Sequence, residues 1–136
     1  MTERLTRMEL IRLLPDKTSG SVVRALDSLE ATIPKFRSIF RTITCDNGTE
    51  FSDINGLEKG HRTKVFYCHP YCSYEKGSNE TANKLIRRHL PKRSNFDTLT
   101  NDRVRQIEEW INTYPRKILG FRTARELYDE EVRKLP

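Results

Sequence analysis

The 136-residue chain contains 35% hydrophobic and 32% charged residues and has a formal net charge of +6. We expect one domain over residues 1–136, with a small core and a large surface that faces solvent or a ligand. No run approaches the roughly 18 apolar residues that a membrane span needs, and residues 1–4 offer no apolar stretch for a signal peptide. The composition therefore excludes a membrane-spanning protein and favours a cytoplasmic one.

The first 16 residues allow two interpretations. Leu5, Met8, Ile11 and Leu14 have helical spacing, yet residues 8–14 are also a short apolar run that could form a strand ending at Pro15. The next segment is clearer, because Thr18 or Ser19 caps a predicted helix that stops before Pro34. The apolar face of this helix carries Val22, Val23, Leu26 and Leu29.

Two short strands are predicted in the middle of the chain, over residues 41–45 and 64–68. The first runs into the turn sequence Asp46-Asn47-Gly48. Between the strands, residues 50–59 predict a short helix closed by Gly60.

Three helices are predicted in the second half of the chain. The first covers residues 76–89 and is terminated by Pro91, and the last begins at a capping box formed by Thr123 and Glu126. The helix between them ends at Pro115 and is marked by Val104, Ile107, Trp110, Ile111 and Tyr114. Strands that alternate with helices predict an α/β domain with helices packed on a sheet.

The positive charge is concentrated in residues 76–93. This segment has one acid, Glu80, and its bases are Lys76, Lys84, Arg87, Arg88, Lys92 and Arg93. Such a local excess favours a polyanionic partner.

The predicted helix over residues 76–89 has two different faces. At 100° per residue, the face around Glu80 carries Lys76, Asn83, Lys84 and Arg87, and the opposite face carries Ala82, Leu85, Ile86 and His89. A carboxylate framed by cations can bind Mg²⁺ while the cations hold nucleic-acid phosphates beside the metal. The alternative is a solvated face with an i,i+4 pair between Glu80 and Lys84.

Asp46 is a second candidate carboxylate. It follows a predicted buried strand, and ligands collect at the carboxyl ends of strands in open α/β sheets. Taken alone, Asp46-Asn47-Gly48 more often indicates only a turn.

Three cysteines, Cys45, Cys68 and Cys72, are an odd number and fit a reducing cytosol. The sequence Cys68-His69-x-x-Cys72 could suggest zinc, but a closed site needs four ligands and the chain has one such cluster. We favour ordinary packing.

Two segments surround Asp46 and Glu80: Thr42-Ile-Thr-Cys-Asp46-Asn-Gly-Thr-Glu-Phe51 and Tyr67-Cys-His-Pro-Tyr-Cys-Ser-Tyr-Glu-Lys-Gly-Ser-Asn-Glu80-Thr-Ala-Asn-Lys-Leu-Ile-Arg-Arg-His-Leu-Pro91. These segments resemble the integrase-type catalytic core of bacterial DDE transposases. Together with Asn112-Thr-Tyr-Pro-Arg-Lys117, they are similar to the insertion sequence thirty family. The similarity covers essentially the whole chain.

The resemblance implies a ribonuclease-H-like fold, in which a mixed sheet is flanked by helices, and makes residues 8–14 a strand. It also implies three carboxylates that hold two Mg²⁺ or Mn²⁺ ions at an in-line displacement on phosphorus. By position, Asp46 resembles the second of these catalytic, metal-binding carboxylates and Glu80 the third. The residues expected to bind nucleic acid are Lys76, Asn79, Asn83, Lys84, Arg87 and Arg88.

The chain also departs from the family's pattern. The first catalytic Asp of such cores lies on the first strand, which would precede residues 2–16, and Asp16 and Asp27 lie in the wrong elements to replace it. We therefore expect an N-terminally truncated core. Tyr74, Lys76 and Ala124 stand where the family often has Trp, Arg and Pro, and none of these changes removes a metal ligand.

We expect a bacterial protein associated with the nucleoid. Two classes of function are compatible with its sequence. The first is a polynucleotidyl transferase core, incomplete in this chain, that acts on transposon ends and target DNA. The second is a non-catalytic truncated transposase that binds DNA or the full-length enzyme as a regulator. A missing first strand would also leave an unpaired sheet edge, through which the chain could form a homodimer. Titration with a divalent metal separates the classes, because two carboxylates without the third should bind Mg²⁺ only weakly.

Overall fold

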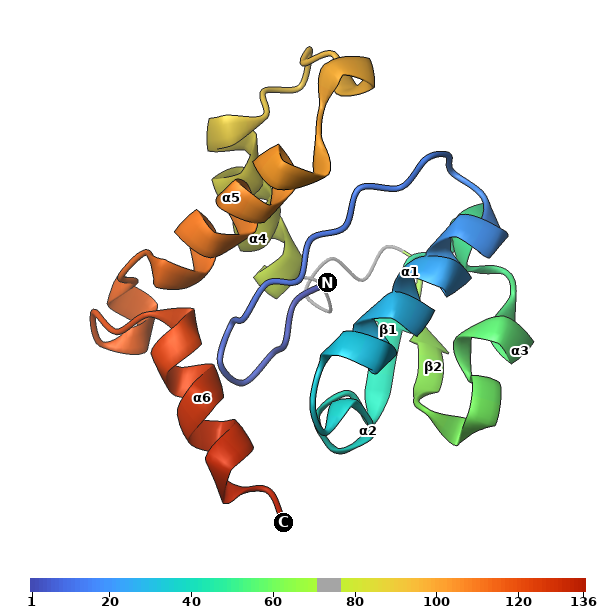
Figure 1. The fold of residues 1–136 in the computed structure, drawn as a ribbon, viewed down its shortest axis with the longest axis horizontal. Coiled ribbons are helices and arrows are strands. Elements are labelled where there is room, and N and C mark those ends of the chain that lie inside the picture. Colours follow the sequence, from blue (N-terminus) through green and yellow to red (C-terminus); the bar gives the residue numbers. More distant parts are fainter. Residues whose placement is uncertain (71–76) are drawn as a thin grey trace. The chain divides into compact units, whose positions relative to one another are not determined.

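The computed structural model describes residues 1–70 and 77–136 (Figure 1). Contacts divide these residues into two compact units, one within residues 14–75 and the other made of residues 1–13 with those of 76–136. The described residues form six α-helices and a small parallel sheet, so the predicted α/β class is confirmed. The extent of a single domain over residues 1–136 stays a prediction.

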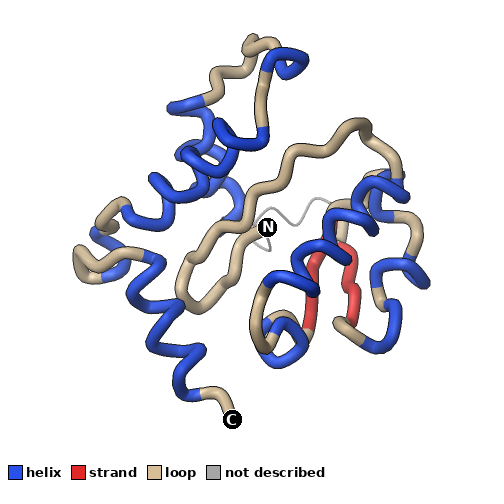
Figure 2. The backbone as a smooth tube through the Cα atoms, viewed as in Figure 1, coloured by secondary structure: helices blue, strands red, loops and turns tan. Residues whose placement is uncertain are grey.

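The unit within residues 14–75 contains the sheet. Strand β1 (Thr42–Cys45) lies beside β2 (Lys64–Tyr67) (Figure 2). The two strands pair in parallel, with Cys45 opposite Tyr67. Both predicted strands are confirmed to within one residue at each end. Cys45 and Val65 point into the core, whereas Phe66 is half exposed.

Helix α1 (Ser19–Thr32) begins where the capping signal predicts. The Thr18 side chain accepts a hydrogen bond from the Ser21 N–H, and the helix buries Leu26 and Leu29. It packs on α2 (Phe36–Ile39), the short 3₁₀ helix η1 (Thr49–Phe51) and α3 (Ile54–Leu57).

The single helix predicted over residues 50–59 is wrong. The segment instead forms η1, α3 and a turn of 3₁₀ helix, η2 (Lys59–His61). The break has a local cause, because the Asp53 side chain accepts a hydrogen bond from the Gly56 N–H at 2.9 Å and starts a new helix there. Gly60 has a φ of 61°, a left-handed conformation that glycine adopts without steric cost.

The other unit is built on three helices, α4 (Gly77–His89), α5 (Asn101–Thr113) and α6 (Ala124–Lys134). Helix α5 packs against both α4 and α6, around a core of Leu85, Ile107 and Ile111. All three predicted helices are confirmed where the structure describes them. The predicted capping box is present, since the Thr123 side chain accepts from the Glu126 N–H and the Glu126 carboxylate accepts from the Thr123 N–H.

The strand predicted over residues 8–14 is wrong, and so is the helical alternative. Within residues 1–16, all of which the structure describes, one bridge forms, antiparallel between Thr2 and Glu9. The Asn112 side chain accepts from the Glu9 N–H and donates to the Glu9 carbonyl, both at 2.8 Å. The Glu108 carboxylate accepts from the Ile11 N–H at 2.7 Å. Side chains of α5 therefore satisfy part of the backbone groups of this segment, and the backbone of Met1 and Glu3 satisfies others.

In the part of the chain that the structure describes, no helix combines the length and the apolar character needed to cross a bilayer.

Candidate functional site

Helix α4 has the two faces that its sequence predicts. Ala82 and Leu85 are buried, and Ile86 and His89 are half-buried. Glu80, Asn83, Lys84 and Arg87 are exposed on the other face, and Asn79 is exposed in the first turn. Lys76, predicted at the start of this face, lies outside the described residues.

The exposed face continues into a surface hollow of about 590 Å³, lined by Asn83, Lys84, Arg87, Arg88 and Lys92. We call these five residues the basic hollow. Four of the six residues predicted to bind nucleic acid meet here, and Asn79 is not among the lining residues. Lys92 belongs to the basic segment but not to the predicted site residues, although its position just after the Pro91 helix stop is a signal for it.

Of the residues that the structure describes, none that lines the basic hollow carries a carboxylate. Among the residues that the structure describes, no salt bridge joins Glu80 to Lys84, so the i,i+4 pair of the alternative interpretation is not formed. The Arg87 guanidinium donates a hydrogen bond to the Leu90 carbonyl at 3.3 Å. This bond orients the Arg87 side chain toward the C-terminal end of α4. Four cations without a neutralising acid form a surface suited to phosphate groups.

An aromatic group lies beside the basic hollow and was missed by the sequence analysis. The Arg88 guanidinium lies 5.9 Å from the centroid of the Tyr114 ring. Tyr114 stacks on Trp110 with centroids 4.8 Å apart, and Trp110 meets the edge of His89 at 4.4 Å. The sequence showed Trp110 and Tyr114 only as members of an apolar helix face. Their half-exposed rings beside a cation were visible only in three dimensions.

Asp46 is exposed at the carboxyl end of β1. Two hydrogen bonds join the carboxyl ends of both strands there. The Asn47 side chain donates to the Cys68 carbonyl at 2.9 Å, and the Cys68 N–H donates to the Cys45 carbonyl at 3.0 Å. Asp46 is therefore the first residue after β1, at the edge of the sheet where the sequence predicts a ligand.

The thiols beside Asp46 are buried. Burial raises the pKa of Cys45 to about 11, with smaller contributions from the charges of Asp46 and Cys68. Cys45 is therefore protonated at neutral pH. Cys72, which would complete the alternative zinc cluster, lies outside the described residues.

Asp46 and Glu80 lie in different compact units, so the shared metal site that the family resemblance implies stays a prediction. Across residues 1–70 and 77–136, no three His, Cys, Asp or Glu side chains gather closely enough to hold a metal ion. A shared metal site would need these two carboxylates to meet.

The motif Asn112-Thr-Tyr-Pro-Arg-Lys117 has a structural part. Asn112 is fully buried and binds the backbone of Glu9. Arg116 is also buried and donates to the carbonyl of Ile111 at 3.3 Å, and its backbone bridges to Arg122. These side chains hold the three-helix unit together rather than facing a ligand.

No family model matches the chain. The chain is 37% identical over 124 residues to the transposase for insertion sequence element IS4351 of Bacteroides fragilis, an alignment that covers 85% of this chain and 38% of that protein. It is 32% identical over 129 residues to the probable transposase for insertion-like sequence element IS1161 of Streptococcus salivarius, covering 95% of this chain and 35% of that protein.

A third relative is transposase InsI for insertion sequence element IS30C of Escherichia coli strain K12. It is 29% identical over 132 residues, which cover 97% of this chain and 34% of that protein. The chain therefore spans little more than a third of the length of these relatives. Its resemblance to insertion-sequence transposases, including those of the insertion sequence thirty family, is confirmed.

Proposed function

We propose that this chain, similar over most of its length to insertion-sequence transposases, is part of a transposase core that cuts and joins DNA strands. One observation carries the proposal. Helix α4 places Glu80 on the same exposed face as a hollow that contains four cations and no carboxylate. We further propose that the parallel β1–β2 pair and its helices are part of a ribonuclease-H-like fold.

Asp46 and Glu80 would hold Mg²⁺ or Mn²⁺. Carboxylate oxygens are the ligands that these hard cations take. Both side chains are exposed, so an ion bound to them would be accessible to a substrate. The bound ions would stabilise the charges on the attacking and leaving oxygens at phosphorus.

The basic hollow would position the substrate. Lys84, Arg87 and Arg88 offer charge-assisted hydrogen bonds to phosphate oxygens, and the Asn83 amide can donate to the same groups. Such contacts do not read base sequence. They would hold the sugar-phosphate backbone next to Glu80.

Only two carboxylates of these 136 residues match the three that the family resemblance implies. We therefore expect this chain by itself to bind divalent metal weakly and not to cleave or join DNA. Removing one member of a catalytic group that acts together usually abolishes nearly all of its contribution. A nicking and strand-joining assay with Mn²⁺ tests this, and turnover that disappears in Asp46→Asn would contradict it.

Titration with Mn²⁺ followed by NMR tests whether Asp46 and Glu80 share a metal. Paramagnetic broadening is expected for the backbone signals around both residues. Asp46→Asn should weaken the broadening around Glu80 as well as around position 46, because the ligand is shared. Asp102→Asn is the matched control, since Asp102 is an exposed acid on α5. Broadening confined to one of the two sites would overturn the shared metal.

Binding of duplex DNA at several salt concentrations tests the basic hollow. Each neutralised phosphate contributes about −0.9 to the slope of log K against log salt. Lys84→Gln with Arg87→Gln should therefore reduce the slope by about two. Arg103→Gln with Arg105→Gln removes the same charge from the exposed face of α5 and should change the slope little. Equal slopes for the wild type and the α4 variant would mean that these cations form only a solvated face.

A second candidate is a non-catalytic regulator that binds DNA or associates with a full-length transposase or a second copy of itself. The basic hollow favours it as well, because its described lining has four cations and no carboxylate, and DNA binding alone needs no metal. This candidate predicts the same salt-dependent DNA binding. It differs in predicting no Mn²⁺ broadening that depends on both Asp46 and Glu80.

A further inference from the structure

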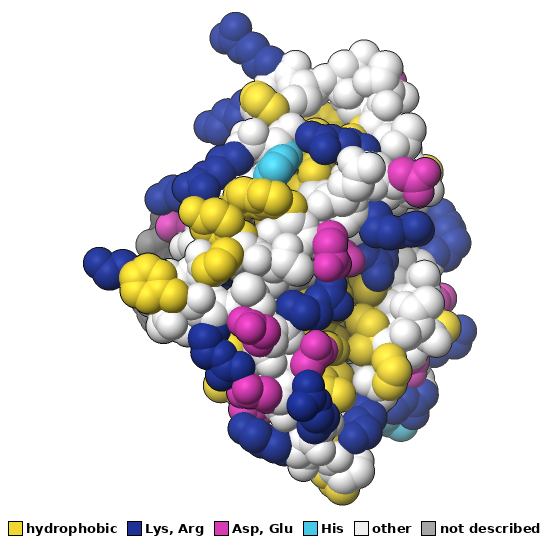
Figure 3. All heavy atoms as spheres, turned by 60° about the vertical axis from the view of Figure 1, so that its left-hand side comes forward, with side chains coloured by type: hydrophobic (Ala, Val, Ile, Leu, Met, Phe, Trp, Pro, Cys, Tyr) yellow, Lys and Arg dark blue, Asp and Glu magenta, His cyan; other side chains and the backbone are white. Residues whose placement is uncertain are grey.

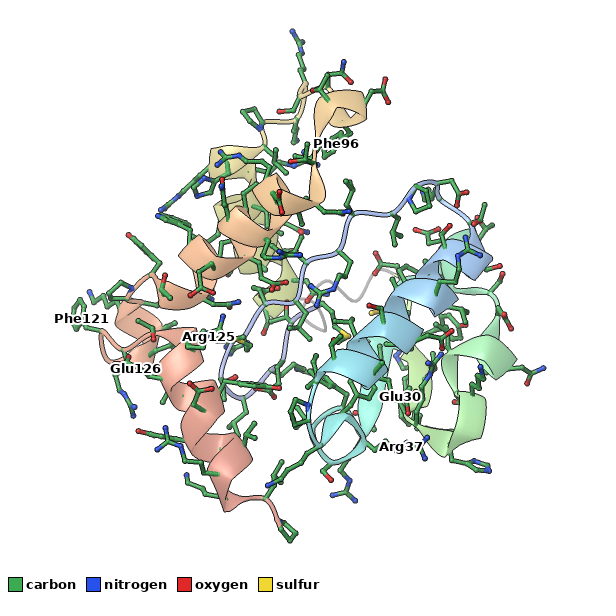
Figure 4. The ribbon with its side chains drawn as sticks, viewed as in Figure 1. Glu30, Arg37, Phe96, Phe121, Arg125 and Glu126 are labelled. Atoms are coloured by element: carbon green, nitrogen blue, oxygen red, sulfur yellow. The ribbon has the colours of Figure 1, made fainter. Side chains whose placement is uncertain are left out.

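The turn between α5 and α6 exposes two large apolar side chains. Ile118 and Phe121 are 74% and 72% exposed, and Tyr114 at the end of α5 is 39% exposed. Figure 4 shows Phe121 at the outer edge of the turn that precedes α6. Grouped apolar side chains in solvent indicate a surface that contacts a ligand or partner.

The backbone of this turn is held in place by hydrogen bonds. The Arg116 N–H donates to the Arg122 carbonyl at 3.1 Å, and the Phe121 N–H donates to the Arg116 carbonyl at 2.9 Å. Phe121 has a φ of 63°, in the left-handed region that bulky residues rarely adopt. A strained residue that displays its ring to solvent suggests that the display serves a function.

Arg88 connects the turn region to the basic hollow. Its side chain lines the hollow, and its guanidinium lies over the Tyr114 ring, which in turn stacks on Trp110. On the side of the molecule where α5 and α6 lie, Figure 3 shows hydrophobic side chains gathered beside a border of lysines and arginines. We call the basic hollow together with Tyr114, Ile118 and Phe121 the aromatic–basic surface.

The combination of rings and cations selects among forms of DNA. A duplex presents phosphates outside and keeps its bases stacked inside, so cations alone are sufficient to bind it. Exposed aromatic and apolar side chains offer a platform for the faces of unpaired bases, and neighbouring cations follow the backbone.

We propose that the aromatic–basic surface binds unpaired nucleotides of DNA, with phosphates in the basic hollow and bases against Tyr114, Ile118 and Phe121. The inference rests on the proposed function only in taking DNA as the ligand. It adds that the chain prefers single-stranded or frayed DNA to intact duplex.

The test compares three fluorescently labelled DNAs of equal length by anisotropy: a single strand, a blunt duplex and a duplex with an unpaired end. The single strand and the unpaired end should bind more tightly than the blunt duplex. Stacking of one base changes affinity by roughly 5- to 150-fold. Ile118→Ala with Phe121→Ala should therefore weaken single-strand binding at least fivefold and leave duplex binding within about twofold.

A matched control is Ile54→Ala with Phe66→Ala, which removes the same two kinds of side chain from exposed positions. Ile54 is 45% exposed and Phe66 is 51% exposed. This variant should bind all three DNAs as the wild type does. The chain's single tryptophan, Trp110, provides a second readout. Its fluorescence should be quenched by the single strand and little changed by the duplex.

Each other outcome overturns the inference in a recognisable way. Equal affinity for single strand and duplex, with no selective loss in the Ile118 and Phe121 variant, would contradict the base contacts while leaving DNA binding intact. Failure to bind any DNA would contradict the proposed function as well. Self-association in sedimentation that disappears in that variant, without a change in DNA binding, would assign the apolar side chains to a second copy of the chain.

Discussion

Arg62 in the unit with the sheet and the arginines of α4 in the helical unit serve opposite purposes. In the unit with the sheet, Arg62 is buried and donates to Asp27 and Glu30 on α1 and to the carbonyls of Leu57 and Gly56. Nearby, Arg37 pairs with Glu30 at 2.9 Å (Figure 4). In the helical unit, the arginines of α4 line a hollow that contains no acid.

The difference lies in the surroundings of the charge and not in its amount. A cation enclosed by carboxylates and carbonyls has its hydrogen-bonding capacity filled, so it stabilises the fold. A cation in a hollow whose described lining has no acid keeps that capacity for a ligand. The net charge of +6 therefore says little about where a polyanion binds. Substitutions of single residues distinguish cations that stabilise the fold from cations that bind a ligand.

The largest effect is expected at Arg62. Replacing it with methionine removes a buried guanidinium and leaves Asp27 and two carbonyls without their donor, whereas Glu30 keeps Arg37. The loss of these hydrogen bonds lowers the free energy of unfolding by about 2–4 kcal/mol. Urea denaturation measures it. Arg37→Met, at an exposed pair, should cost less than about 1 kcal/mol, and an equally small loss at Arg62 would contradict a structural role.

The buried carboxyl group of Glu9 in the helical unit predicts that the stability of the fold depends on pH. Burial raises the pKa of Glu9 from 4.5 to about 7, against the opposing effects of the terminal ammonium of Met1, the Thr2 hydroxyl, Arg116 and Arg7. Between pH 4.5 and 7 the folded state therefore holds a proton that the unfolded state has lost. Stability should fall as pH rises through this window, by at most about 3 kcal/mol.

Comparison of the wild type with Glu9→Gln isolates this contribution. The variant has no carboxyl group to titrate, so its free energy of unfolding should change less between pH 5 and pH 7. Glu131→Gln serves as the control, because Glu131 is on the surface and paired with Lys134. A pH dependence that is identical in all three proteins would show that Glu9 titrates normally.

A smaller loss is expected at Asn112. Alanine at this position leaves the N–H and carbonyl of Glu9 buried without a partner, which costs about 2 kcal/mol. Hydrogen exchange at the Glu9 amide should accelerate in parallel. Asn101→Ala, at the exposed start of the same helix, should leave both quantities nearly unchanged. Retained protection at Glu9 would show that Asn112 does not hold this segment.

The smallest effect on stability is expected at the basic hollow. Lys84→Gln with Arg87→Gln removes exposed cations that no acid neutralises, so the free energy of unfolding should stay within about 0.5 kcal/mol of the wild type. The same variant should show the largest loss of DNA affinity. A clear destabilisation would mean that these cations also stabilise the fold.

The sequence by itself was sufficient where the signals are local. Thr18 and the pair Thr123 and Glu126 mark helix starts because a capping side chain binds backbone within three residues. The buried positions Ala82 and Leu85 follow from helical periodicity alone, and the exposed face around Glu80 follows with them. The clustering of cations on α4 was likewise readable from the chain.

Only the tertiary structure decided features that depend on distant partners. Residues 8–14 form no strand because Asn112, 103 positions from Glu9, binds the backbone there. Arg62 stabilises the fold because its guanidinium forms ion pairs with Asp27 and Glu30 of α1. Arg88 meets Tyr114 because α4 packs on α5. Local spacing carries no information on such pairings, since hydrogen bonds and ring contacts depend on proximity in space, which the packing of the helices creates.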